Sequence, residues 1–536
     1  MTDKTGGTRA PRRAGTLAVL AAVAVLATAC DVVHVHIGPS GGRATAVSGT
    51  YQQNLAYARC MRGHGLPDFP LPDPSRTSGV SRHVIANPNS AAARANEACG
   101  HLLSAGGTGT VTASPPGAAP DDCLASQPGC YPPRQFRVAY GIAPLLDRGI
   151  TGRGVTVVLP EEAETGPARP EPPARILAAV TDIRQDMAGF DGRFGLPPAR
   201  IQVITTALAG SSASPWLASV EEVEDTELVH AVAPGAAIIE LLVDPAYVST
   251  PARFAATWAA AVRIAARHGE VISQSGIGRM FDLGEGAWTS AEVATMNSAL
   301  RYAAARRVTV VVGSGDQGAL GNGSSTPVKE IILPTSDPQV LAAGGTRLTA
   351  DPVTGAYIGE TAWNDPPGSQ GPSASGGGFS HWFARPAYQD GVPGIGAMRG
   401  MPDVAADASS ATGMALAFSA PGGGYEFFGA GGTSAAAPFW AALIALADQE
   451  AGRPLGFVNP AIYRIARGPM YHKAFHDITT GDNTVVSNGV TVTGYAAGPG
   501  WDPVTGLGTP DAQVLIPLLA RPEQAVSMII TNKCLS

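Results

Sequence analysis

Short runs of β-branched and other apolar residues recur along the chain from Val155 to Gly345. They cover residues 155–159, 201–205, 237–243, 271–275, 308–315 and 340–345. Such runs are typical of strands that are buried on both faces, as strands are in a parallel sheet. We therefore predict a strand at each of these segments.

Alanine-rich amphipathic stretches lie between the later runs and predict helices at residues 253–269 and 290–307. Alternation of strands with helices favours an α/β fold, in which a mostly parallel sheet carries helices on both faces. In such folds ligands bind in a crevice at the carboxyl ends of the strands. We expect the functional residues of this chain near that edge of the sheet.

Acidic residues crowd into one stretch, VEEVEDTELVH, just before the predicted strand at 237–243. Two of its five carboxylates, Glu221 and Asp225, are four residues apart, so a helix places them on one face. Like charges at that distance, with Glu222, Glu224 and Glu227 nearby, disfavour full ionisation and raise at least one carboxyl pKa. The ordinary alternative for such a run is a solvated acidic helix face.

An almost wholly apolar helix is predicted to begin at Ser434, directly after Gly431, Gly432 and Thr433. A serine at a helix N-terminus lies beside free N–H groups and the positive end of the helix dipole, which suit a developing oxyanion. Pro438 is tolerated because it is expected to fall within the first turn. The alternative is a buried alanine-rich helix with a serine N-cap.

The segment GGTSAAAP, residues 431–438, has a G-T-S-A-x-x-P pattern that subtilisin-like and sedolisin-like serine peptidases share. The two groups differ in the base that activates the serine. Subtilisins need a histidine in an H-G-T-H type segment, and none of the ten histidines of this chain lies in one. A carboxylate must then act as the base, and residues 221–225 supply the candidates.

Further motifs occur in the order found in the sedolisin family, the serine-carboxyl peptidases, and residues 130–520 resemble that family. The motifs are PRQFRVAYGI, E-x-x-x-D followed by APGA, GSGDQG, LPTSDPQVLAAGGT, ETAWND, SGGGFS, RGMPDVAADAS and GGTSAAAP. The resemblance implies a subtilisin-like α/β fold with Glu221, Asp225 and Ser434 as the catalytic triad. It also implies that Asp316 is the oxyanion-hole residue.

The resemblance implies a role for each acid. Glu221 accepts the proton of Ser434 as the general base, and Asp225 shares a proton with Glu221 and orients it. A protonated Asp316 can donate a hydrogen bond to the tetrahedral intermediate, whereas an ionised one would repel it. Such a site is expected to operate at acidic pH.

Two C-terminal segments, FHDITTGDN and AAGPGWDPVTGLGTP, match the calcium-binding segments of the same family. The resemblance implies one Ca2+ ion held by the carboxylates of Asp477 and Asp502 and by the main-chain carbonyls of Ile478, Gly498 and Gly500. Oxygen ligands of this kind suit Ca2+ better than a transition metal.

The N-terminal part of the chain predicts export. Three arginines precede the apolar run TLAVLAAVAVLATA, as in a signal peptide over residues 1–30, and LATAC resembles a lipoprotein processing site with Cys30 as the lipidated residue. Cleavage without lipidation is the alternative. Composition divides the rest into a small lipoprotein-like module, a linker, the peptidase domain and a tail, at residues 31–104, 105–122, 123–520 and 521–536.

Export would place the other cysteines in an oxidising compartment, where disulfides persist. Sequence order suggests that Cys60 pairs with Cys99 in the small module and that Cys123 pairs with Cys130. Cys534 is then left over near the C-terminus.

Charge bounds the class of partner. The 536 residues carry 36 basic and 43 acidic side chains, a net charge of -7, and no basic block that could follow a phosphate backbone. This balance argues against nucleic-acid binding. We expect protein or peptide substrates, a monomer outside the cell or at its surface, and membrane contact only through a lipid on Cys30.

The expected function is that of an exported endopeptidase acting through an acyl-enzyme on Ser434. A tripeptidyl-peptidase-type exopeptidase and an inactive peptide-binding lipoprotein are the alternatives. Gln317 and Gly276 stand where the family usually has a serine and an aromatic residue that lines the substrate cleft. The cleavage preference is therefore left open.

Overall fold

The computed structural model describes residues 59, 60 and 62 and residues 130–521, the latter without residues 165, 170–178, 211–212, 277–282, 321–326, 369–370, 422 and 488. The chain divides into two units, residues 1–110 and 111–536, and the fold below is that of the second unit. The predicted signal peptide and linker, and nearly all of the small module and tail, lie outside the described residues. Cys60 and Cys130 are disulfide-bonded, but the pairings suggested above stay predictions.

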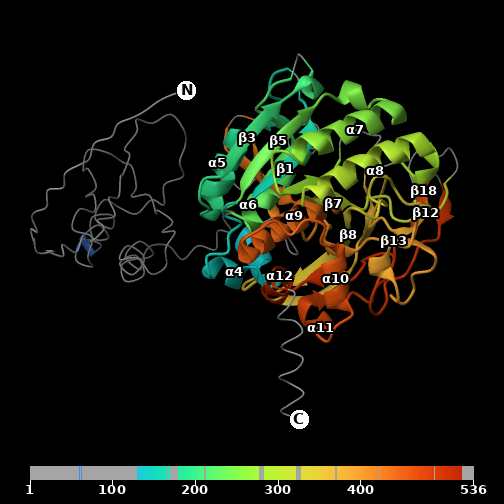
Figure 1. The fold of residues 1–536 in the computed structure, drawn as a ribbon. Coiled ribbons are helices and arrows are strands. Elements are labelled where there is room, and N and C mark those ends of the chain that lie inside the picture. Colours follow the sequence, from blue (N-terminus) through green and yellow to red (C-terminus); the bar gives the residue numbers. More distant parts are fainter. Residues whose placement is uncertain are drawn as a thin grey trace, which may run out of the picture. The chain divides into compact units, whose positions relative to one another are not determined.

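An eight-stranded sheet runs through the second unit (Figure 1). Every pair of neighbours in it is parallel except β8 with β9. The strands, in spatial order, are β14 (Val404–Asp407), β8 (Leu341–Ala350), β7 (Thr309–Gly313), β6 (Val271–Gln274), β1 (Thr156–Glu162), β5 (Ala237–Val243) and β3 (Arg200–Thr205), and β9 (Tyr357–Ala362) pairs with β8. The prediction of a mostly parallel sheet is confirmed.

All six predicted strand segments form strands of this sheet. β5 has the predicted bounds, and the others differ from the prediction mainly at their ends: β1 and β8 continue further, whereas β7 ends before its glycine-rich turn. Most of the strand residues are buried, as expected of a parallel sheet that is covered on both sides.

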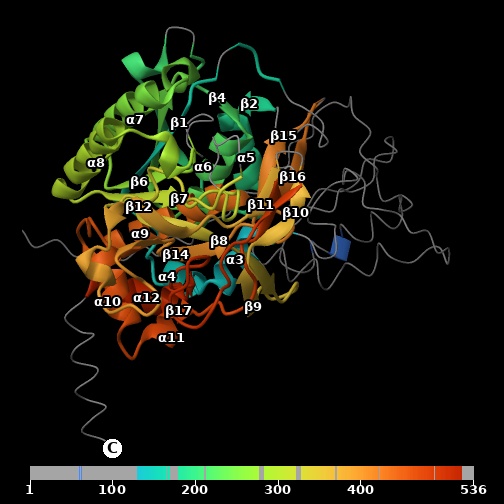
Figure 2. The same cartoon turned by 90° about the vertical axis from the view of Figure 1, so that its right-hand side faces the viewer.

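Helices cover both faces of the sheet (Figures 1 and 2). On one face α7 (Pro251–Ala265) packs beside α8 (Ser290–Ala305), and on the other α6 (Val220–Val232) packs beside α9 (Gly432–Ala451). Alternate residues of β1 divide between them: Val157 and Leu159 belong to the core of α6 and α9, and Val158 belongs to that of α7 and α8. The predicted two-sided cover of helices is confirmed.

The remaining elements surround this arrangement. The further helices are α3 (Pro133–Ala139), α4 (Ala143–Asp147), α5 (Ile183–Phe194), α10 (Asn459–Ala466), α11 (Tyr471–Ala474) and α12 (Ala512–Ala520). The strands of the small sheets are β2 (Val180–Asp182), β4 (Leu217–Ser219), β10 (Asn364–Gly368), β11 (Gly371–Ala374), β12 (Gly378–Ala384), β13 (Met398–Met401), β15 (Ala415–Ser419), β16 (Tyr425–Gly429), β17 (Phe475–His476), β18 (Val485–Ser487), β19 (Val490–Val492) and β20 (Thr509–Pro510). Within the described part of the chain, every helix is too short or too polar to cross a membrane.

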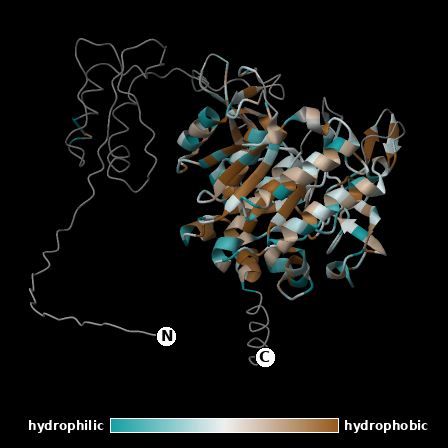
Figure 3. Ribbon diagram, turned by 45° about the horizontal axis from the view of Figure 1, so that its top comes forward, coloured by the Kyte–Doolittle hydropathy of each residue, from teal (hydrophilic) through white to brown (hydrophobic). Residues whose placement is uncertain are grey.

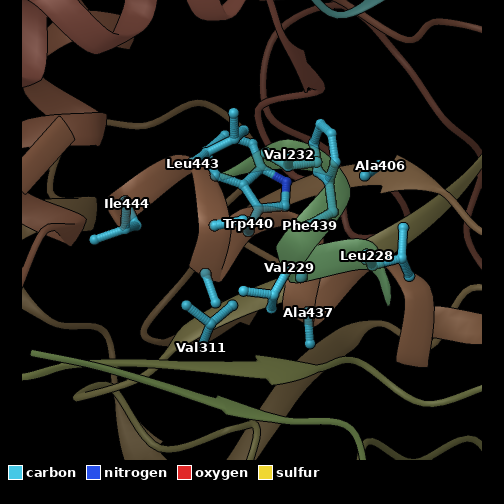
Figure 4. Close-up of a cluster of buried hydrophobic side chains, with 14 of the residues drawn as sticks. Leu228, Val229, Val232, Val311, Ala406, Ala437, Phe439, Trp440, Leu443 and Ile444 are labelled. Atoms are coloured by element: carbon cyan, nitrogen blue, oxygen red, sulfur yellow. The ribbon is translucent and has the colours of Figure 1, made fainter. Parts of the chain in front are cut away.

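The helix α9 is buried over most of its length. Every side chain from Ala435 to Asp448 is buried. Trp440 lies in the apolar cluster that α9 forms with Val229 of α6 and Val311 of β7 (Figure 4), and its indole N–H donates to the carbonyl of Ala405 at 2.9 Å. Hydropathy colouring shows hydrophobic strands in the interior of the second unit (Figure 3). The core therefore fixes the helix that begins beside Ser434.

We expect Leu443→Ala, in the buried middle of α9, to lower the free energy of unfolding by about 2–5 kcal/mol, because it removes core contacts and leaves a cavity. Val353→Ala, at a side chain that is 83% exposed, should change it by less than about 0.5 kcal/mol. Denaturant unfolding of both variants checks this. Equal effects would contradict the assignment of α9 to the core.

Candidate active site

Three polar side chains come from the carboxyl ends of three neighbouring strands. Glu161 is the next-to-last residue of β1, Ser275 directly follows β6, and Asp316 comes three residues after the end of β7. The strands lie in the order β7, β6, β1 and are parallel, so their carboxyl ends meet at one edge of the sheet. This is the edge at which α/β folds bind ligands.

The acidic helix α6 is buried rather than solvated. Its first turn is fixed by a capping box, in which the carboxylate of Glu222 accepts a hydrogen bond from the main-chain N–H of Ser219. Every side chain from Glu222 to Val232 is buried, and Glu221 is half-buried. The alternative of a solvated acidic face is therefore wrong.

Asp225 of α6 lies at the centre of a group of carboxyls. The Ser275 hydroxyl is 2.8 Å from each of its two carboxyl oxygens, and Glu161 shares a side-chain hydrogen bond with it. Burial raises the pKa of Asp225, and the nearby charge of Glu221 raises it further. Burial and the charge of Asp225 likewise raise the pKa of Glu161. The group therefore retains protons at pH values where isolated carboxyls lose them.

Two more acids bind the N-terminus of α9. The N–H of Gly431 donates to the Glu224 carboxylate at 3.0 Å, and the N–H and hydroxyl of Thr433 donate to Oδ1 of Asp316 at 2.7 and 2.9 Å. The side chain of Asp316 keeps some solvent exposure, but burial of its carboxyl group raises its pKa. The two hydrogen bonds from Thr433 lower the pKa and only partly oppose this effect. Both acids lie where the helix dipole favours negative charge.

The start of α9 differs from the prediction. The helix begins at Gly432, so Pro438 is its seventh residue and lies beyond the first turn. Proline has no N–H, so the carbonyl of Ser434, four residues earlier, lacks its usual helical donor. The Ser275 hydroxyl lies 3.2 Å from that carbonyl oxygen. Ser275 thus contacts both Asp225 and the main chain of Ser434.

The structure brings the predicted residues Asp225, Asp316 and Ser434 to one edge, and Glu221 acts electrostatically on Asp225. Sequence reasoning missed Glu161 and Ser275. Both stand at the carboxyl ends of strands that were predicted correctly, so applying the crevice rule to every polar residue at those ends would have found them.

A small, partly open pocket adjoins Asp316. It is lined by the turn after β7, including Gln317, and by Gly376 and Gly377 of the SGGGFS motif. A side chain at Gly376 would collide with the carbonyl of Ser314, so the close approach of these two segments requires glycine there. The pocket therefore lies directly beside the candidate oxyanion residue.

The two predicted calcium carboxylates lie on two segments that contact each other, one after β17 and the other before β20. Asp477 accepts from the N–H of Gly500 at 3.0 Å, and Asp502 accepts from the N–H of Gly498 at 3.3 Å. Burial is the main cause that raises the pKa of Tyr471, and the charges of Asp477 and Asp502 raise it further. Both carboxylates therefore lie near the Tyr471 hydroxyl. Burial also raises the pKa of Asp502 to about 6. One buried carboxyl, Asp502, and one half-buried carboxyl, Asp477, are oxygen ligands of the kind that a hard cation prefers.

The described residues hold no group of three or more His, Cys, Asp or Glu side chains that could bind a metal ion. The predicted calcium set contains only two carboxylates and relies on main-chain carbonyls for the rest. It is therefore compatible with that finding and is not tested by it.

Comparison with known proteins finds close relatives, although no family model matches the chain. Kumamolisin from Bacillus sp. (strain MN-32) is 38% identical over 297 residues, which are 54% of this chain and 49% of kumamolisin. Tripeptidyl-peptidase 1 from Macaca fascicularis is 31% identical over 259 residues, which are 44% of this chain and 42% of that protein. The chain spans about half, or less, of the length of these curated relatives.

The fold has a solved counterpart. A structure of Pseudomonas sedolisin, a serine-carboxyl proteinase complexed with two molecules of pseudo-iodotyrostatin, aligns over 74% of this chain and 98% of its own, with a TM-score of 0.58 and 26% sequence identity. The likeness therefore extends over nearly all of that protein, in fold as well as in sequence.

Folding stability should fall as the pH rises. Burial raises the pKa of Glu240 to about 7 and that of Asp407 to about 8, well above ordinary carboxyl values. A raised pKa favours folding below the unfolded-state pKa, and the contribution is lost as the pH rises through the folded-state pKa. We expect the melting temperature to fall between about pH 5 and pH 8.

Glu240→Gln, which cannot ionise, should reduce this fall, whereas Asp147→Asn at an exposed helix end should not. Scanning calorimetry at several pH values checks the prediction. A melting temperature that rises across the range would contradict it.

Proposed function

Because the chain belongs to the sedolisin family of serine-carboxyl peptidases, we propose that it is an exported endopeptidase that hydrolyses peptide bonds at acidic pH. The single observation that carries the proposal is the connection from Asp225 through the Ser275 hydroxyl to the main chain of Ser434. It joins a proton-retaining carboxyl group to the N-terminus of the helix that bears the nucleophile.

The first step proposed is attack by Ser434 Oγ on the substrate carbonyl. The Glu221 carboxylate accepts the serine proton as the new C–O bond forms, and then gives that proton to the leaving amine as the peptide bond breaks. Water attacks the resulting acyl-enzyme, with Glu221 again as the base, and releases the second product. Each proton removed is returned, so the enzyme ends as it began.

Asp225 and Glu161 support Glu221 in this scheme. Both are buried, and both have raised pKa values. A proton held on Asp225 or Glu161 reduces the negative charge beside Glu221. Glu221 itself stays unprotonated, so its carboxylate can accept the serine proton. The arrangement works only while the group holds that proton, which is the reason for expecting activity in acid.

We assign Asp316 the role of hydrogen-bond donor to the oxyanion. Thr433 donates two hydrogen bonds to Oδ1, so a proton on Asp316 is best placed on the other oxygen, Oδ2. A Cβ at Gly432 would lie 2.5 Å from Oδ2, and Gly432 itself has a φ of 74°. Glycine at this position keeps the space beside Oδ2 open for the oxyanion.

An exopeptidase that releases tripeptides is the second candidate, because one relative is a tripeptidyl-peptidase. Mass spectrometry of the products from a long peptide separates the two. Internal fragments support the endopeptidase, and a ladder of N-terminal tripeptides supports the exopeptidase. An inactive peptide-binding lipoprotein is the third candidate, and hydrolysis of a denatured protein at pH 4 would exclude it.

Export is part of the proposal and rests on the N-terminal sequence. We place the mature protein outside the cytoplasm as a monomer, with a lipid on Cys30 as its only membrane contact. Metabolic labelling with a fatty-acid analogue tests the lipid. A labelled wild type and an unlabelled Cys30→Ser variant would support it, and equal labelling of the two would overturn it.

A Ca2+ ion is proposed near the C-terminus, held by Asp477 and Asp502 and by the carbonyls of Ile478, Gly498 and Gly500. The ion would supply positive charge beside buried Asp502 and half-buried Asp477 and would join the two segments that carry them. Its part is structural, because the reaction above uses only side chains of the chain itself.

We expect Ser434→Ala to abolish hydrolysis and to leave the melting temperature nearly unchanged, because it removes one hydroxyl among small residues. Glu221→Gln should be nearly as damaging, since an amide cannot accept the serine proton. Glu222→Gln is the matched control, because Glu222 caps α6 instead. A peptide-hydrolysis assay at pH 4 checks this, and a worse effect of Glu222→Gln would contradict the choice of base.

Asp316→Ala should lower kcat by about 10² to 10³, because it removes one oxyanion donor. Asp316→Asn should keep more activity, and the high-pH limb of its profile should move to higher pH, because an amide donates at every pH. The pH dependence of kcat for the three proteins checks this. A limb that stays fixed in an active Asn variant would assign the limiting proton to Glu221 and Asp225.

Chelation should lower the melting temperature. An ion that binds only the folded state stabilises it by about 2.7 kcal/mol when free Ca2+ exceeds its dissociation constant a hundredfold. Asp502→Ala should abolish the response to chelator and to added Ca2+, whereas Asp147→Asn should retain it. Thermal melts with and without chelator check this, and a wild type that does not respond would refute the site.

A further inference from the structure

We propose that Ser275 is a positioning residue whose hydroxyl hydrogen points either to the Asp225 carboxylate or to the main-chain carbonyl of Ser434, according to whether Asp225 carries a proton. The inference rests on the proposed function, because it concerns the same reacting group. It adds a residue through which the protonation state of Asp225 changes the hydrogen bonding of Ser434.

The geometry around the hydroxyl requires a choice between acceptors. Ser275 Oγ is 2.8 Å from both carboxyl oxygens of Asp225 and 3.2 Å from the carbonyl oxygen of Ser434. A serine hydroxyl has one hydrogen and two lone pairs, whereas a carbonyl oxygen can only accept. The hydroxyl therefore cannot donate fully to both partners at once.

The Ser434 carbonyl has a specific need for this donor. In an α-helix the N–H four residues later would bind it, but that residue is Pro438, which has no N–H. Ser275 comes from the end of β6, an element remote in sequence, and it supplies a hydroxyl at the position where the helix lacks its N–H. The proline and the serine therefore form a complementary pair.

The protonation state of Asp225 decides which way the hydroxyl points. An ionised Asp225 only accepts, so the Ser275 hydrogen turns to it. A protonated Asp225 can itself donate to Ser275 Oγ, which frees the Ser275 hydrogen for the Ser434 carbonyl. The hydrogen bonds around Ser434 are then complete only in the protonated state.

Most of the acids that face Asp225 favour that state. Glu221 and Glu224 from α6 and Glu240 from β5 repel a negative charge on it. Glu161 from β1 acts the other way, because its hydrogen bond with Asp225 lowers the pKa of Asp225. The repulsion from the other three acids keeps a proton on the group as the pH rises. Acid thus serves two purposes, because it supplies the proton and it fixes the first turn of α9 that carries Ser434.

A mutant cycle between Ser275 and Pro438 tests this directly. Ser275→Ala should lower kcat by about tenfold with little change in KM, because the nucleophile loses its positioning bond. Pro438→Ala supplies an N–H at residue 438 and should change kcat little by itself. In the double variant this N–H should restore most of the lost activity.

The pH profile gives a second readout that simple packing would not move. An ionised Asp225 in Ser275→Ala loses a hydrogen-bond donor, so it takes up a proton more readily and the high-pH limb of kcat should move to higher pH. Ser273→Ala is the matched control, because Ser273 is on the same strand, is fully buried and has no hydrogen-bond partner for its hydroxyl. It should leave the limb in place.

Additive effects of Ser275→Ala and Pro438→Ala on kcat, together with an unmoved limb, would overturn the inference while leaving the peptidase assignment intact. If the wild type hydrolyses no peptide, the proposed function falls, and the melting temperatures of the same cycle at pH 4 decide the inference. Restoration of the melting temperature in the double variant would then support it, and additivity would overturn it. Should Ser275→Ala fail to fold, Ser275→Cys, a weaker donor, replaces it in the cycle.

Discussion

The hydrogen bonds at the N-terminus of α9 are the interactions on which the rest of the site depends. Glu224 binds the N–H of Gly431, Asp316 binds Thr433, and Ser275 reaches the carbonyl of Ser434. These partners come from a helix and from two strand ends that lie far apart in the sequence. A helix that is buried from Ala435 to Asp448 holds the serine in place, and the acids gain from the positive end of its dipole.

Burial of so many carboxyls lowers the stability of the fold when they are ionised, but it provides the protonated carboxyls that the proposed chemistry uses. Desolvation disfavours their charged forms, and among the described ion pairs none joins Asp225, Glu224 or Asp316 to a basic residue. The simplest way to satisfy such a group is to keep protons on it. The same physical cause therefore favours stability in acid and supplies the protonated carboxyls that the proposed reaction needs.

Much of this fold could be predicted from the sequence, because the apolar runs of a parallel sheet and the alternation with helices follow directly from burial. The predictions from sequence were least accurate where tertiary contacts determine the local structure. Pro438 could not be placed correctly because α9 starts at Gly432, before the serine, and that start depends on Asp316 and Glu224. The part played by Ser275 could not be predicted at all, since its value comes from a proline 163 positions later in the sequence. Glu161 could have been found from its place at the carboxyl end of a predicted strand, but its contact with Asp225 depends on how α6 packs against the sheet.

Labelling of Ser434 by a fluorophosphonate shows whether the buried carboxyls activate this serine, because attack of Oγ on phosphorus with loss of fluoride needs an activated serine but no particular peptide. We expect a covalent adduct that peptide mapping places on Ser434, formed fastest in acid and lost in Glu221→Gln. Labelling that increases steadily from acidic to alkaline pH, or that is unaffected by Glu221→Gln, would show that these carboxyls do not activate the serine and would contradict the account.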